Sequence, residues 1–95
     1  MTHYIALIHK QPDSIYGASF PDLPGVTAVA DTLDDVMSAA AEVLAFAAED
    51  WREMTGQAFP APRTIDQIRQ DPTLAGDLSE AIVAAVPVPA SALAA

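Results

Sequence analysis

One long amphipathic segment constrains the fold of this chain more than any other part of it. Residues 33–54 carry apolar side chains at three- and four-residue spacing, with acids at many of the other positions. This pattern predicts a helix that packs one face against a core, and the helix would be about 33 Å long. The positions expected to face the core, Trp51 and the methionines included, are Val36, Met37, Ala40, Val43, Leu44, Ala47, Trp51 and Met54.

Both ends of this predicted helix carry specific signals. Thr32 is the expected N-cap, accepting a hydrogen bond from the backbone N–H of Asp35. Asp34 and Asp35 lie in the first turn, where the helix dipole favours negative charge. Gly56 suits the left-handed position that commonly follows a last turn.

Three short apolar segments precede the helix. Residues 2–9 are apolar on both faces, which predicts a strand that is covered or paired on both sides. Residues 15–20 follow a turn, and residues 26–30 follow the break PDLPG. The two prolines of that break lack the N–H a central strand needs, and its Leu23 is expected to enter the core. We predict an antiparallel meander of three strands.

The segment after the helix predicts a short helix and a final strand. Thr64 and Gln67 resemble a capping box that opens a helix ending near Gln70, and residues 79–88 have strand composition. The expected fold is α+β, in the order β-β-β-α-α-β, with helices on one sheet face. The other face is expected to lie uncovered and to invite a second subunit. Residues 1–88 form the predicted domain, and residues 89–95 a flexible tail.

The charge balance excludes some classes of partner. Thirteen acids oppose four basic residues, for a net charge of −9. Nucleic-acid binding requires lysines and arginines that neutralise phosphates, so we expect none here. An acidic field attracts basic partners instead. The sequence shows no cysteine, no signal peptide and no membrane span, and we expect a soluble cytoplasmic protein without membrane contact.

The sequence also lacks the usual signals of catalysis. His3 and His9 lie on one strand face, roughly 20 Å apart, which is too far to share a metal ion. No nucleophile elbow or glycine-rich phosphate loop is present. We therefore expect no enzyme, no cofactor and no metal. One alternative remains open, a vestigial metal-dependent ribonuclease that uses Asp22, Asp31 and Glu42.

The stretch YGASFPDLPGVTAVADTLDDVMSAAAEVLAFAAEDW, residues 16–51, closely resembles the HicB family of antitoxins. The shared pattern runs Tyr-Gly-x-x-Phe-Pro-Asp-Leu-Pro-Gly, then a threonine-containing strand, then Asp-Thr-Leu and two acids before an alanine-rich helix. The flanking YIALIHKQPDS and PAPRTIDQI are also similar, so the resemblance covers residues 2–88.

This resemblance implies a partial ribonuclease-H-like fold without its catalytic acids. Family members bind HicA, a small basic ribonuclease, cover its catalytic histidine, and assemble as dimers or higher oligomers. Many carry a C-terminal DNA-binding domain. After Val88 only PASALAA remains, and we expect no DNA-binding domain in this chain.

The resulting hypothesis is an antitoxin that binds and covers a basic HicA-type toxin. Acids would pair with the toxin's lysines and arginines, and apolar side chains would form the buried centre. The residues predicted to take part are Asp22, Leu23, Asp31, Asp35, Glu49, Asp50 and Trp51. Each of them also has a structural explanation as a cap, a solvated surface residue or a core residue. A second alternative is an oligomerisation module of a truncated transcriptional regulator.

Overall fold

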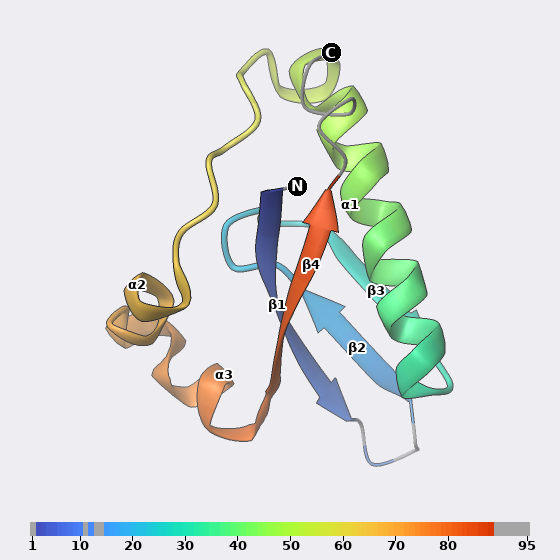
Figure 1. The fold of residues 1–95 in the computed structure, drawn as a ribbon, viewed down its shortest axis with the longest axis vertical. Coiled ribbons are helices and arrows are strands. Elements are labelled where there is room, and N and C mark those ends of the chain that lie inside the picture. Colours follow the sequence, from blue (N-terminus) through green and yellow to red (C-terminus); the bar gives the residue numbers. More distant parts are fainter. Residues whose placement is uncertain (1, 11, 13–14, 89–95) are drawn as a thin grey trace.

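The structure is a computed structural model that describes residues 2–10, 12 and 15–88. Its elements are β1 (Thr2–Lys10), β2 (Tyr16–Ser19), β3 (Thr27–Ala30), α1 (Leu33–Thr55), α2 (Ile65–Arg69), the 3₁₀ helix η1 (Pro72–Leu74), α3 (Ala75–Glu80) and β4 (Ile82–Val88). Figure 1 shows α1 as one long rod beside the sheet. The predicted α+β class and the three-stranded meander are confirmed.

The sheet has the order β3-β2-β1-β4, and its neighbouring strands are antiparallel. The final strand pairs with the first over seven residues, from Thr2 opposite Val88 to Ile8 opposite Ile82. β1 is therefore an inner strand with partners on both edges. Its side chains are apolar on both faces because α1 covers one face and α3 covers part of the other.

Helix α1 packs across one face of the sheet. Tyr4, Ala6 and Ile8 alternate toward it from β1, and all three are buried. They share one hydrophobic cluster with Ala40 and Leu44 of α1. Alanine side chains are short, so the helix can approach the strands closely.

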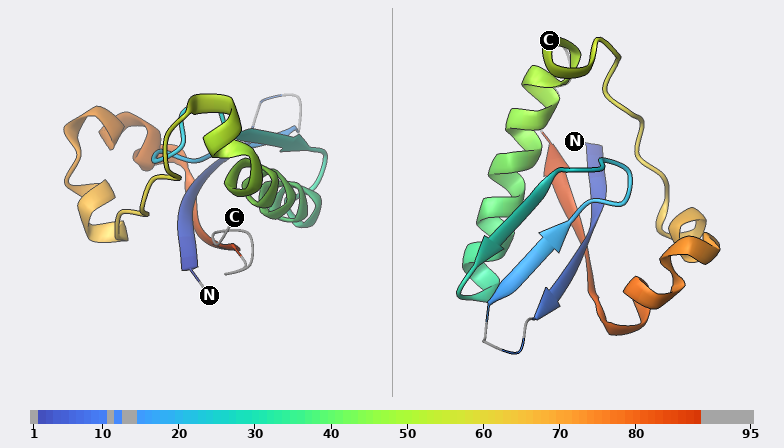
Figure 2. Two further views of the ribbon diagram at one scale, coloured as in Figure 1. Left: turned by 90° about the horizontal axis from the view of Figure 1, so that it is seen from above. Right: turned by 180° about the vertical axis from the view of Figure 1, so that it is seen from behind.

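The face of the sheet opposite α1 is partly covered, which corrects the expectation that nothing in the chain covers it. Helix α3 contacts β1, and His9 Nε2 lies 3.0 Å from the backbone oxygen of Asp77. Leu7, which alternates to this face, is also buried. Figure 2 shows β1 and β4 lying between α1 and the segment from α2 to α3. Val29 of β3 stays 71% exposed.

The predicted helix caps are confirmed. Thr32 Oγ1 accepts a hydrogen bond from the N–H of Asp35 at 3.1 Å. Gly56 has a φ of 74°, and its N–H donates to the carbonyl oxygen of Arg52 at 2.8 Å. The capping box of Thr64 and Gln67 is complete. Local hydrogen bonds therefore define where α1 ends and where α2 begins.

The predicted final strand is too long at its start. Ser79 and Glu80 belong to α3, and β4 begins at Ile82. Asp71 caps a further turn by accepting from the N–H of Thr73, and the chain continues as helix through alanine and leucine, which are strong helix formers. The predicted tail, residues 89–95, lies outside the described residues.

Replacing Leu44 by alanine tests how far the core depends on α1. Leu44 is fully buried, so Leu44→Ala removes buried methyl groups and leaves a cavity. We expect the free energy of unfolding to fall by about 2–5 kcal/mol in urea titrations. Phe46→Ala on the exposed side of the same helix is the control, with a loss below about 1 kcal/mol. Similar losses for both variants would contradict the packing described here.

Candidate partner-binding surface

The residues predicted to bind a partner do not form one cluster. Asp31 and Asp35 are exposed at the start of α1, while Glu49 and Asp50 are exposed near its end. Fifteen residues of helix separate Asp35 from Asp50, a rise of about 22 Å. The acidic side chains thus lie along the length of the helix.

The two predicted residues of the PDLPG loop are held inside the protein. Leu23 has no exposed surface. The carboxylate of Asp22 is only 7% exposed and accepts hydrogen bonds from the backbone N–H of Arg63, at 2.8 Å, and from its Nε. In this conformation, both residues shape the loop from within and leave little surface for a partner.

Arg63 connects that loop to the segment after α1. Its Nη1 donates to Asp71 Oδ2 at 3.0 Å, in addition to the contacts with Asp22. Hydrogen bonds from Thr73 and from Arg63 lower the pKa of Asp71, and the bonds to Asp22 and Asp71 raise the pKa of Arg63. A single guanidinium therefore joins two segments that are 41 and 8 residues away in sequence.

A cavity of about 610 Å³ lies at the end of α1. Phe59 packs against Tyr4, with ring centroids 5.2 Å apart, and against Trp51 at 5.5 Å with nearly perpendicular planes. The Tyr4 hydroxyl donates to the carbonyl oxygen of Pro60, and burial, followed by the charge of Asp22, raises its pKa. Trp51 is partly buried against the core, as expected from its helical spacing.

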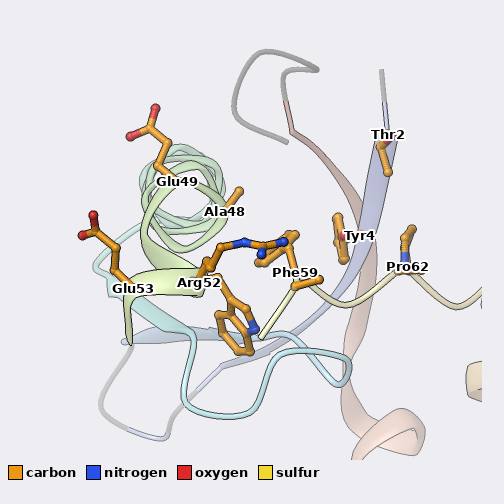
Figure 3. Close-up of a pocket in the computed structure, with 11 residues that line it drawn as sticks. Thr2, Tyr4, Ala48, Glu49, Arg52, Glu53, Phe59 and Pro62 are labelled. Atoms are coloured by element: carbon orange, nitrogen blue, oxygen red, sulfur yellow. The ribbon is translucent and has the colours of Figure 1, made fainter. Parts of the chain in front are cut away.

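Figure 3 shows how the charged side chains lie at this cavity. Arg52 extends over the cavity toward Phe59 and Tyr4, and Glu49 and Glu53 point away from it. Both glutamates belong to the lining of the cavity, but their carboxylates are turned away from its aromatic side chains.

A second, more apolar hollow of about 220 Å³ lies beside α1. We call it the α1 groove, and it is lined by Gly25, Val26, Val43, Phe46, Ala47, Asp50 and Met54. Met54 was expected in the core but is 65% exposed, because it follows the last core-facing turns of the helix. Phe46 was not predicted, since it falls outside the spacing that identified the core. The sequence did offer one signal for Phe46, because an aromatic residue on the polar side of an amphipathic helix is unusual and indicates an exposed apolar contact.

The structure does not bring together Asp22, Asp31 and Glu42, the acids of the alternative that the chain is a metal-dependent ribonuclease. Among the described residues, which include Asp22, Asp31 and Glu42, no three histidine, aspartate or glutamate side chains are grouped so that they could hold one metal ion. Asp22 is engaged by Arg63 instead. Within the same residues, no helix is long and apolar enough to cross a membrane.

Comparisons with known proteins agree with this architecture. Residues 4–95 match the family described as HicB_like antitoxin of bacterial toxin-antitoxin system. The chain belongs to this family. No curated protein matches the sequence.

Solved structures include similar HicB antitoxins. The crystal structure of the Burkholderia pseudomallei antitoxin HicB is 29% identical with a TM-score of 0.77, over 98% of this chain and 67% of that one. Its N-terminal domain is 27% identical with a TM-score of 0.74, over 93% of this chain and 99% of the domain. A HicA3 and HicB3 toxin-antitoxin complex shares the fold, with 22% identity, a TM-score of 0.70 and coverage of 93% and 99%.

Replacing Arg63 tests its connecting role. In Arg63→Ala, the nearly buried Asp22 carboxylate loses its charged partner, and we expect unfolding to become easier by about 1–3 kcal/mol. Hydrogen exchange of residues 21–26 and 64–74 should accelerate together in mass-spectrometric measurements. Arg69→Ala, at an exposed arginine of α2, is the control. Unchanged exchange in Arg63→Ala would contradict the connection.

Proposed function

We propose that this chain is an antitoxin that binds a basic, RNA-cleaving toxin of the HicA type and covers its catalytic surface. The observation that carries the proposal is the exposed side of α1, where Asp31, Asp35, Glu49 and Asp50 lie at or along one helix. Family membership supports the antitoxin role. The HicA3 and HicB3 structure, which has the same fold, is a toxin-antitoxin complex and supports a partner of the HicA type.

The physical mechanism is electrostatic attraction followed by exclusion. The net charge of −9 speeds the approach of a cationic protein and orients it. Exposed acids can then pair with toxin lysines and arginines without the cost of burying lone charges. The antitoxin needs no catalytic residue for this role, because it acts by occupying the surface that RNA would use.

Charge reversal tests this mechanism. Glu49→Lys with Asp50→Lys should raise the Kd for a HicA-type toxin by about tenfold or more, mainly through slower association. The salt dependence of binding should weaken at the same time. Binding kinetics at several salt concentrations give both quantities.

The matched control is Asp77→Lys with Glu80→Lys, which makes the same charge change on exposed positions of α3. It should alter the Kd only a few-fold through the overall field. Equal effects of the two pairs would show that net charge matters and the α1 surface does not. Absence of any complex with the unchanged chain, together with failure to rescue cells that express the toxin, would refute the antitoxin proposal itself.

We also propose that the chain self-associates as a dimer or tetramer in the cytoplasm, through the free edge of β3. Val29 lies opposite Gly17 on the neighbouring strand, so no side chain from that position shields it, and it stays 71% exposed. Exposed apolar edge strands promote pairing with another chain. The same feature favours the alternative of an oligomerisation module.

Sedimentation velocity tests the self-association. Val29→Lys places a charge on the exposed edge and should shift the protein toward monomer, with at least a tenfold rise in the dissociation constant. Folding should be preserved, because Val29 contributes little to the core. An unchanged oligomer would exclude the β3 edge as the interface.

A further inference from the structure

Two large apolar side chains are exposed at the α1 groove. Phe46 is 63% exposed and Met54 is 65% exposed, and they lie eight residues apart on the same side of α1. Both line the groove together with Val26 and Val43. Large apolar side chains scattered singly on a surface are ordinary, but here they converge on one hollow.

One acid, Asp50, lines this hollow and is exposed. Glu42 is also exposed and lies four residues before Phe46, on the same helix face. Glu49 and Glu53 line the larger cavity at the end of α1 instead.

No basic residue offsets these acids within the groove. The four basic residues of the chain are Lys10, Arg52, Arg63 and Arg69, and none of them lines it. Arg52, the basic residue of α1, lines the other cavity. The groove therefore has an apolar floor, one acid, Asp50, and no lysine or arginine among the described residues that line it.

We propose that the α1 groove is the docking site for an apolar side chain of the toxin that is flanked by lysine or arginine residues. This inference rests on the proposed function and adds the contact centre to it: Phe46 and Met54 supply the buried apolar contact, and the acids of α1 pair with the flanking cations. Charge complementarity selects this occupant over a second copy of the chain, because two copies, each with a net charge of −9, would bring acidic surfaces together at Asp50.

The arrangement fits the usual anatomy of a protein interface. Affinity concentrates in a few central apolar or aromatic side chains from which water is excluded, and charged rims contribute orientation and rate. A phenylalanine and a flexible methionine can adapt to an incoming side chain. The groove is small, and it serves as the centre of a larger contact.

The test uses Phe46→Ser and Met54→Ser in the full chain, with isothermal titration of a catalytically inactive variant of a HicA-type toxin. We expect the Kd to rise about 30-fold for Phe46→Ser and about tenfold for Met54→Ser. Ile82→Ser is the control, because Ile82 is a 47% exposed apolar residue outside the groove, and its Kd should stay within about twofold. Circular dichroism and thermal unfolding establish that each variant is folded.

The possible outcomes distinguish the groove proposal from the proposed antitoxin function. A toxin affinity that is unchanged in both groove variants, while the unaltered chain binds, overturns the groove proposal and leaves the antitoxin role intact. A change in self-association with unaltered toxin affinity assigns the groove to a second copy and also overturns it. If the unaltered chain does not bind the toxin, the proposed function fails and the groove proposal fails with it.

Discussion

The pairing of β1 with β4 is the contact on which the rest of the structure depends. It joins the first and last strands of the described chain and makes β1 an inner strand, bonded on both edges. Because β4 lies beside β1, the segment between α1 and β4 has to lead the chain back to the sheet. The returning segment supplies the aromatic contact of Phe59, the ion pairs of Arg63 and the cover over one sheet face.

The two sides of α1 differ because one of them packs against this sheet. One side of the helix is bound to the sheet through small and branched side chains, which leaves the acidic side free over its whole length. All six acids of α1 are exposed, and a rigid helix holds them in a fixed array. The proposed recognition of a basic partner rests on this array.

Much of the fold could be predicted because its signals are local. The cap at Thr32, the glycine after α1 and the capping box at Thr64 each depend on residues within a few positions, and all three are confirmed. The short helix α3 was missed, and its residues 79 and 80 were assigned to the final strand. Six helical residues without a side-chain cap bond carry too weak a local signal, and contact with β1 decides their conformation.

The candidate site was less predictable than the fold. Composition and helical spacing alone determined the acidic, cation-poor character of this protein and the length of its main helix, because charge and periodicity are properties of the chain itself. The inward position of Leu23 was expected from the sequence. Only the tertiary structure decided that the Asp22 carboxylate is held by Arg63, and that Met54 and Phe46 remain exposed beside one hollow that Asp50 also lines. Exposure depends on which elements pack together over long sequence distances, and no local pattern records that.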